Sequence, residues 1–551
     1  MTEPIKHITI VGGGTAGWMS AAYLMIHLNR RALNQQVEVT VIESPNVPTV
    51  GVGEATVPAM MQWLQYLGIE EADFIKRCNA SFKLAVRFVH WDKDPQTGAR
   101  RSYLNPFDGV GNDIWGFNPA YHFHRFAQRD DRTRFCDFHS PMHELIDNLR
   151  GPRTIGSAGY ERSVNYAYHL DAGQFAAFLQ EIAIACGVNH ILDDVVDIDL
   201  DEKGYVDALQ LKEGGRHPVE LVIDCTGFRG MIIQQKLGVK FESYDKHLLN
   251  DRAVAVQIPH QDPAKLEPVT TSTALGAGWS WRVPLYSRVG TGYVFSSAFR
   301  SDEEAVDEFL THLGPRAQDA EPRVLGMRVG RSEKSWEKNC VAIGLSGGFI
   351  EPLESTAIFM IDMALQWLTN YFPDKSFSPV LQKRFNDSMA ELAYEIRDFI
   401  VMHYCTNTRL DTDYWRAARN DIQIPDGLRE DLELFRHTLP RSEEMERGHL
   451  FSYLTYLIVL FGKGYFDDVT FPAEHLVSRR DWKEYQRYLR DLKANLLQTL
   501  PNHYELLNHI RSQAQEAEEP VFADAPVAGG DAMAPIITFK NSPAATTANI
   551  L

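Results

Sequence analysis

The stretch HITIVGGGTAGWMSAAYLMIHL at residues 7–28, with VEVTVIES at 37–44 shortly after it, decides the fold of this chain. A β-branched apolar run leads into three glycines and then into a long apolar segment without proline. This order is typical of a buried strand, a tight turn and a helix. The second apolar run predicts another strand, so the chain is expected to open with a β-α-β unit.

The glycines of this unit fit the pattern G-x-G-x-x-G. In that pattern the first glycine allows the tight turn, the second lets the backbone approach a pyrophosphate, and the third lets helix and strand pack closely. The phosphates then face the helix N-terminus. A plain glycine-rich turn is the alternative. The candidate cofactor-binding residues are Gly12, Gly14, Thr15, Ala16 and Gly17, with Glu43 placed to accept hydrogen bonds from a ribose.

Two later segments indicate which dinucleotide is bound. VELVIDCTGFRG at 219–230 reads as a strand, and NCVAIGLSGGFIEPLESTAIFMI at 339–361 reads as a strand, a glycine-rich turn and a helix. Both resemble segments of FAD-dependent monooxygenases, where a late glycine turn brings backbone amides to the flavin. The resemblance implies that Gly347, Gly348, Ile350 and Ala55 lie near FAD; otherwise these glycines merely cap elements. We find no second G-x-G-x-x-G motif for a nicotinamide cofactor, so reduced flavin is expected to come from a separate reductase.

GWSWRVP at 278–284 contains two tryptophans one residue apart, which share a face if the stretch is a strand. By itself the pair is more typical of a buried strand end. The stretch is similar to the W-x-W-x-I-P signature of flavin-dependent tryptophan halogenases, with Val283 in place of isoleucine. The likeness covers roughly residues 5–510 and includes GGGTAGW, VGVGEATVP, SFKLAVRFVHW, YHLDAGQFAAFL, DCTGFRG and GLSGGFIEPLEST.

The resemblance implies a reaction and roles for particular residues. Such enzymes use reduced FAD, oxygen and chloride or bromide to make hypohalous acid, which travels through a tunnel to a lysine. Lys83 matches that lysine, and it would either hydrogen-bond the hypohalous acid or carry the halogen as a haloamine. Either role suits a lysine in a dry place where its pKa falls. Glu354 matches the second essential residue, which orients the acid or accepts the proton released by the arene.

Further residues follow from the same resemblance. Backbone amides of Thr356 and Ala357 match the halide site, although many relatives have glycine at the second position. Trp279 and Trp281 would line the region between flavin and substrate as a barrier. The other residues expected along the tunnel and substrate site are Asn105, Pro106, Phe107 and Ser355.

The substrate is expected to be a neutral indole or another electron-rich aromatic rather than free tryptophan. Asn105 stands where a histidine is common in the family. RGHLFSYLTYLIVLFGKGYFDD at 447–468 is mostly apolar, and the polar clamp that grips the amino-acid end of tryptophan cannot be aligned in it. An aromatic, apolar lining offers stacking without such a clamp.

The predicted fold class is α/β. A Rossmann-like FAD-binding module of the flavin monooxygenase type occupies residues 1–370, with long inserted segments at 46–150 and 240–320. A mostly helical substrate-binding region follows at 371–515, and 516–551, rich in Ala, Pro, Glu and Thr, is expected to be a loosely ordered tail.

Composition limits the remaining classes. The chain has 551 residues and a formal net charge of −18, which argues against a nucleic-acid surface. Its six cysteines are scattered, so we expect no metal site and a reducing cytoplasm. We expect neither a leader nor a membrane span, and a monomer or homodimer. A flavin monooxygenase that hydroxylates an aromatic, a halogenase of free tryptophan and a non-catalytic FAD-binding protein remain as alternatives.

Overall fold

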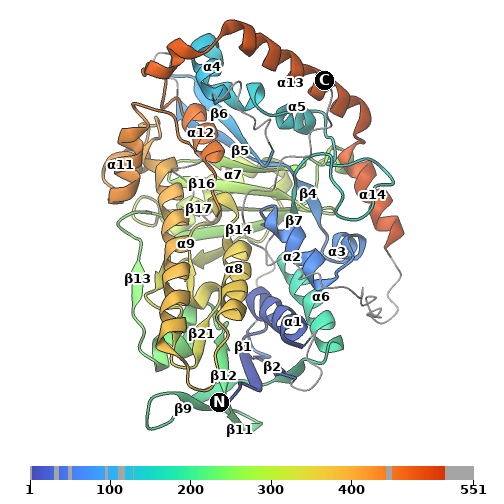
Figure 1. Ribbon diagram of the computed structural model, residues 1–551, viewed down its shortest axis with the longest axis vertical. Helices are drawn as coiled ribbons and strands as arrows, with labels where there is room; N and C mark the ends of the chain where they lie inside the picture. The colour runs from blue at the N-terminus through green and yellow to red at the C-terminus, as the bar shows by residue number, and fades with distance from the viewer. Residues whose placement is uncertain are drawn as a thin grey trace.

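The computed structural model describes residues 3–29, 36–47, 53–93, 97–108, 118–127, 129–441 and 450–514. The molecule is elongated, with strands β9 and β11 near one end of its long axis and helices α4 and α13 at the other (Figure 1). The tail predicted at 516–551 lies outside the described residues.

The sheet that the opening motif predicts has six strands. Neighbouring strands are parallel, except that the edge strand Trp336–Glu337 pairs antiparallel with Cys340–Ala342. The prediction of a β-α-β unit is confirmed, because β1 pairs with β2 and helix α1 joins them. In order across the sheet the strands are β20 (Trp336–Glu337), β21 (Cys340–Ala342), β12 (Leu221–Asp224), β1 (His7–Val11), β2 (Glu38–Glu43) and β8 (Asn189–Leu192).

Helices and a meander cover this sheet. Helix α1 (Thr15–Asn29) packs against α6 (Ala172–Ala185) and α8 (Ala357–Asn370). It is buried from Gly17 to Leu24, as expected for a helix that is apolar all round. An apolar cluster joins side chains of the sheet to those of β10 and of a short helix. The covering elements are β9 (Val195–Leu200), β10 (Val206–Leu211), β11 (Gly215–Pro218) and the short helix Met231–Lys236.

A second, seven-stranded sheet is built from segments far apart in the sequence. It is antiparallel except where β15 pairs in parallel with β5. Both inserted segments predicted from the sequence, 46–150 and 240–320, contribute strands. In order the strands are β18 (Arg323–Gly326), β14 (Arg252–Ile258), β17 (Val289–Phe295), β16 (Gly278–Pro284), β15 (Val269–Ala274), β5 (Ala85–Lys93) and β6 (Arg100–Pro106).

The remaining strands form two further three-stranded sheets. One has the order β3 (Gly53–Ala55), β7 (Ala167–Asp171), β4 (Ser81–Lys83), and its strand β3 contacts β16 and β17 of the large sheet. It brings Ala55 and Lys83 to opposite sides of β7. The other sheet has the order β13 (Phe241–Ser243), β19 (Gly330–Ser332), β22 (Gly348–Phe349).

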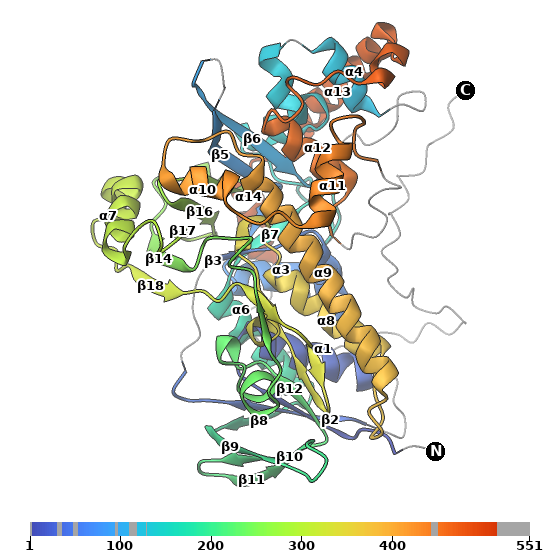
Figure 2. The same ribbon diagram turned by 90° about the vertical axis from the view of Figure 1, so that its left-hand side faces the viewer.

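The C-terminal part is helical, as predicted. Figure 2 shows α9 running along the molecule past α8, which it contacts, toward α10 and α11. Helix α13 packs on α4 and α5, and α14 packs on α3. The boundary at residue 370 stays a prediction. The helices after it are α9 (Pro379–Cys405), α10 (Asp413–Asn420), α11 (Asp426–Leu434), α12 (Tyr453–Gly462), α13 (Arg479–Thr499) and α14 (His503–Gln513). Earlier ones are α2 (Ala59–Leu67), α3 (Glu71–Arg77), α4 (Pro119–Phe126), α5 (Met142–Asp147) and α7 (Asp302–Leu313).

Candidate active site

The turn between β1 and α1 has room only for glycine at two places. Gly12 has a φ of +122°, and a Cβ there would lie 2.3 Å from the carbonyl oxygen of Cys225. A Cβ on Gly17 would lie 1.8 Å from the carbonyl oxygen of Gly12. At Gly14, by contrast, a Cβ would meet no atom within 4 Å, so the backbone there is open to an approaching pyrophosphate. The turn fits a dinucleotide.

Glu43 lies beside this turn. It ends β2, and a Cβ on Gly13 would be only 2.0 Å from its carboxyl carbon. One carboxylate oxygen is 3.0 Å from Nε2 of His190, and the side chain is 22% exposed. A carboxylate with this access to solvent can accept hydrogen bonds from a ribose.

The glycine-rich segment at 343–348 lies at the carboxyl end of the parallel strands, near the turn described above. The carbonyl oxygen of Asp224 accepts a hydrogen bond from the amide of Ile343 (3.0 Å) and another from the hydroxyl of Ser346. Gly344 lies against α1, because a Cβ there would be 2.6 Å from Cβ of Ala16. The carboxyl ends of three parallel strands therefore converge where open α/β sheets bind ligands.

The turn predicted directly before α8 is longer than the sequence suggested. Strand β22 and the 3₁₀ turn Pro352–Glu354 stand between Gly347 and the helix. Ile350 in this stretch is buried, and Ala55 ends β3 just before Thr56. The cofactor roles of Gly347, Gly348, Ile350 and Ala55 stay predictions.

Lys83 is the last residue of β4 and is fully buried. Its Nζ donates hydrogen bonds to the carbonyl oxygen of Thr56 (2.9 Å) and to Oγ of Ser355 (2.9 Å), and it lies 4.9 Å from the centre of the Phe107 ring. An ammonium has three donors, so one remains for a reactant. Burial lowers the pKa of Lys83 to about 7, although the nearby Glu354 acts in the opposite direction.

We expect this lysine to make stability depend on pH. Its pKa is about 7 in the folded protein against an ordinary 10.5, so the unfolded chain holds the proton more tightly between these values. Its contribution to stability is therefore lowest below pH 7 and rises as the pH increases toward 10.5. Between pH 7 and pH 9, cofactor-free wild type should gain about 2 kcal/mol in free energy of unfolding relative to Lys83→Met. Urea unfolding of both proteins checks this, and equal changes would contradict a dry site.

Glu354 ends the 3₁₀ turn and is 5% exposed. Nδ2 of Asn105, on β6, lies 3.2 Å from both carboxylate oxygens. Nε2 of His403, on α9, lies 3.1 Å from Oε1. Asn105, which marks a departure from the family pattern, therefore contacts the carboxylate expected to accept a proton.

A sharp turn connects this carboxylate to α8. Ser355 has φ 61° and ψ 42°, a left-handed conformation that is uncommon for a residue other than glycine. Thr356 is the N-cap and Ala357 the first residue of α8. The amides of a first helical turn have no partner within the helix, and the helix dipole favours an anion there. The predicted halide position fits this geometry.

The tryptophan pair lies on β16, and the prediction that its members share a face is confirmed. Their rings are 6.4 Å apart at an interplanar angle of 61°. The ring of Trp281 covers Gly292, where a Cβ would be 2.0 Å from it. Nε1 of the buried Trp279 donates a hydrogen bond of 2.8 Å to Oε2 of Glu351. The same oxygen accepts hydrogen bonds from Asn250 and Tyr404, so a buried carboxylate holds the indole in place.

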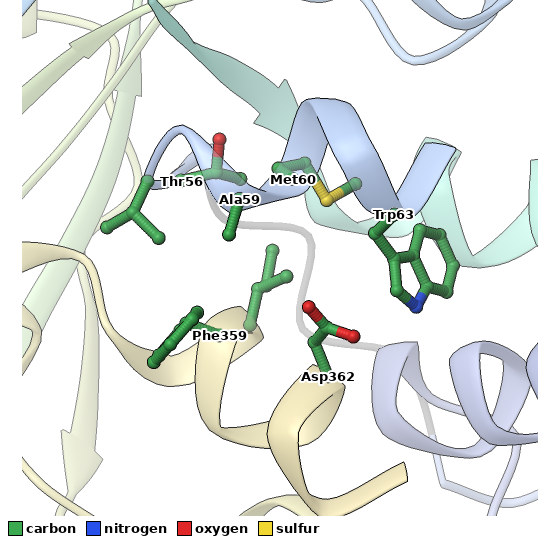
Figure 3. Close-up of a pocket in the computed structure, with 8 residues that line it drawn as sticks. Thr56, Ala59, Met60, Trp63, Phe359 and Asp362 are labelled. Carbon is green, nitrogen blue, oxygen red and sulfur yellow. The ribbon is translucent and has the colours of Figure 1, made fainter. Parts of the chain in front are cut away.

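A small cavity adjoins this region between α2 and α8 (Figure 3). Thr56, whose carbonyl oxygen binds Lys83, lines it together with Phe359 of the first turn of α8. Trp63 and Asp362 lie at its other side. Burial raises the pKa of Asp362 to about 7. The cavity has a volume of about 10 Å³, which is room for about one water molecule between the start of α8 and α2.

The structure brings most of the predicted residues together. Phe107 and Ser355 contact Lys83, and Asn105 contacts Glu354. Pro106 precedes Phe107 at the end of β6. Sequence reasoning did not single out His403, Glu351 or Asn250, since a lone histidine in FIVMHYC at 399–405 carries no motif. The site offers a cationic donor beside a carboxylate acceptor.

A dinucleotide turn of this kind on a parallel sheet, together with a buried lysine and glutamate, is the arrangement expected of a flavin-dependent oxidoreductase. The family model described as "Tryptophan halogenase" matches residues 7–478. The chain belongs to this family, whose members use FAD and a halide.

Its relatives match along nearly their whole length. The chain is 37% identical to 7-chloro-L-tryptophan 6-halogenase KtzR of Kutzneria sp. (strain 744), over 92% of this chain and 99% of that protein. The structure of tryptophan 6-halogenase SttH from Streptomyces toxytricini is 37% identical with a TM-score of 0.85, covering 92% of this chain and 100% of that one. Xcc4156, a flavin-dependent halogenase from Xanthomonas campestris, is 34% identical with a TM-score of 0.81, covering 92% and 98%.

Membrane-spanning helices and clustered metal ligands are both absent from the described ranges. No helix in them is both long enough and apolar enough to cross a bilayer. In the same ranges, no group of three or more His, Cys, Asp or Glu side chains is arranged to hold a metal ion.

Proposed function

We propose that this protein attaches chlorine or bromine to the indole ring of a small aromatic substrate, using reduced FAD and oxygen. The observation that carries the proposal is the buried Lys83 ammonium with one donor left over, next to Ser355 and the carboxylate of Glu354. FAD, when bound in its reduced form, would activate oxygen, and oxygen would be the oxidant that converts halide into hypohalous acid.

Residues of the chain would bind the cofactor, the halide and hypohalous acid, and would accept the proton. The glycine turn and Glu43 would hold the dinucleotide, and the amides at the start of α8 would hold the halide. Lys83 would hold hypohalous acid by a hydrogen bond that polarises it toward the arene. Glu354 would accept the proton that the arene loses. Trp279 and Trp281 would keep the arene away from the flavin.

We further propose that a neutral indole is the preferred substrate, because each charged residue described in the expected clamp region is already paired with another side chain. Helix α12 packs on β6, which carries Asn105, and α12 is buried from Tyr456 to Gly462. The charged residues described between 450 and 468 are Lys463, Asp467 and Asp468. Nζ of the fully buried Lys463 lies 3.0 Å from Oδ2 of Asp92, while Asp467 pairs with Arg101 (3.1 Å) and Asp468 with Arg436 (2.9 Å). Residues 447–449, the rest of the region, lie outside the described residues.

Free tryptophan is the alternative substrate. The names of the relatives KtzR and SttH describe halogenation of tryptophan, and similarity to them favours free tryptophan as the substrate of this chain. A site for tryptophan must replace the water around an ammonium and a carboxylate, and a buried charge without a partner costs roughly 2–5 kcal/mol. The ratio of kcat/KM for indole to kcat/KM for tryptophan therefore distinguishes the two substrates.

The function is tested by incubating the protein with FAD, a flavin reductase, NADH, chloride or bromide, and either indole or tryptophan. Mass spectrometry should show a gain of halogen, whereas a gain of oxygen would indicate a hydroxylating monooxygenase. No product from any indole would contradict catalysis of this kind. With NADH but no reductase, bound FAD should stay oxidised, since no nicotinamide-binding motif was found in the sequence.

We expect kcat/KM for indole to exceed that for tryptophan at least ~10-fold, which corresponds to about 1.4 kcal/mol in transition-state binding. Attack should fall on C3, the most electron-rich carbon, and NMR of the product reads the position. A preference for tryptophan would reveal a clamp that the described residues do not show.

A further inference from the structure

His403 has no part in the function proposed above, yet it lies against Glu354. It is fully buried in α9. The rings of Phe88, Trp91 and Phe399 surround it, with centroids 5.0, 6.2 and 5.1 Å from its own. A polar imidazole in such surroundings is costly unless its nitrogens have partners.

One nitrogen of His403 has a partner that sets the tautomer. Nδ1 lies 2.9 Å from the carbonyl oxygen of Phe399, and a carbonyl only accepts, so Nδ1 carries the hydrogen. In the neutral ring the lone pair is then on Nε2. Nε2 makes no hydrogen bond within the described part of the chain. It is nevertheless only 3.1 Å from Oε1 of Glu354, although the ring plane is not turned to point at that oxygen.

We propose that His403 takes the proton from Glu354, so that the two side chains act as one proton acceptor during halogenation. This inference rests on the proposed function. A small rotation of the His403 ring would bring the lone pair of Nε2 into line with the hydroxyl of a protonated Glu354. Asn105, which donates to both oxygens of Glu354, favours the ionised carboxylate that this transfer leaves behind.

The step balances in protons and electrons. The O–X bond of hypohalous acid breaks, X forms a bond to the ring carbon, and the departing hydroxide takes a proton from the Lys83 ammonium to become water. The C–H bond of that carbon then breaks, its electron pair restores the aromatic ring, and the proton passes to Glu354 and on to His403. Return of this proton to the Lys83 amine restores the starting state.

Two carboxyl groups lie around His403. Glu354 and Glu351 both face it. Burial raises the pKa of Glu351, and His403 acts on that carboxyl group in the opposite direction. One oxygen of Glu351, Oε1, has no hydrogen-bond partner among the described residues. Lys83 acts on Glu354 from the other side. Moving the proton from Glu354 to His403 would take it away from the reacting carbon, and the resulting ion pair would be stabilised by the 3.1 Å contact between Nε2 and Oε1.

The test compares His403→Asn with a matched variant elsewhere. Asparagine can still donate to the Phe399 carbonyl but is no base. The control is His124→Asn, since His124 is also buried between a carboxylate, Oε1 of Glu474 at 2.7 Å, and a carbonyl, that of Phe466 at 2.9 Å. Single-turnover product formation is measured with ordinary indole and with indole deuterated at every ring carbon, or with tryptophan labelled likewise if that is the substrate turned over.

We expect His403→Asn to slow product formation about 10-fold and to show a deuterium isotope effect of about 2 or more, because proton loss from the ring becomes rate-limiting. Wild type and His124→Asn should show an isotope effect near 1. Slow product formation by His403→Asn without an isotope effect would mean a structural role and overturn the proposal. If this variant does not fold, His403→Gln is measured in the same way. Absence of halogenated product from wild type would instead overturn the proposed function.

Discussion

Lys83→Ala should lose halogenation by roughly 10³-fold or more while oxidising reduced FAD at the wild-type rate. The reason is the position of the lysine. Its Nζ is held by Thr56 and Ser355. In the proposed function it acts on the hypohalous acid that the flavin reaction yields rather than on the flavin. Product is measured by mass spectrometry, and flavin oxidation is followed by absorbance in stopped flow.

Lys83→Met is the matched variant for this result. It keeps most of the length of the side chain and removes the charge, so loss of activity with a raised or unchanged melting temperature would exclude unfolding as the cause. Both variants should bind FAD as wild type does. Halogenated product near the wild-type level in either one would remove Lys83 from the mechanism.

Glu354→Gln should lower the rate of halogenation about 10²-fold. Glutamine preserves the shape and can still accept a hydrogen bond from Asn105, but it cannot take a proton. Because the carboxylate also lies near Lys83, the substitution should lower the pKa of that lysine further, since the opposite charge is lost. Single-turnover rates with a fixed halide concentration measure the effect.

Glu474→Gln provides the control for this variant. Glu474 is likewise a buried carboxylate beside a histidine, His124, but it lies on the segment between α12 and α13. Its replacement should leave halogenation unchanged per folded, FAD-bound protein. An equal loss in both variants would show that any buried carboxylate substitution disturbs the enzyme.

Parts of the site could be anticipated because their signals are local. The glycines at 12, 14 and 17 stand within six residues, and those at 12 and 17 have a steric reason in the turn itself. The W-x-W stretch is one strand, and period two alone places both rings on one face. The path from Gly347 to α8 could not be predicted in detail, because the 3₁₀ turn Pro352–Glu354 has no distinct periodicity.

The amino-acid sequence by itself determined the β-α-β unit, the FAD-type turn and the helical character of the C-terminal part. Hydrophobic periodicity and glycine placement act between near neighbours in the chain, so they can be read without a fold. Only the tertiary structure decided that Ser355 meets Lys83 across 272 residues and that Asn105 meets Glu354 across 249. It also placed His403 against that carboxylate. Such contacts depend on how β4, β6 and α9 pack around the start of α8, and packing is a property of the whole chain.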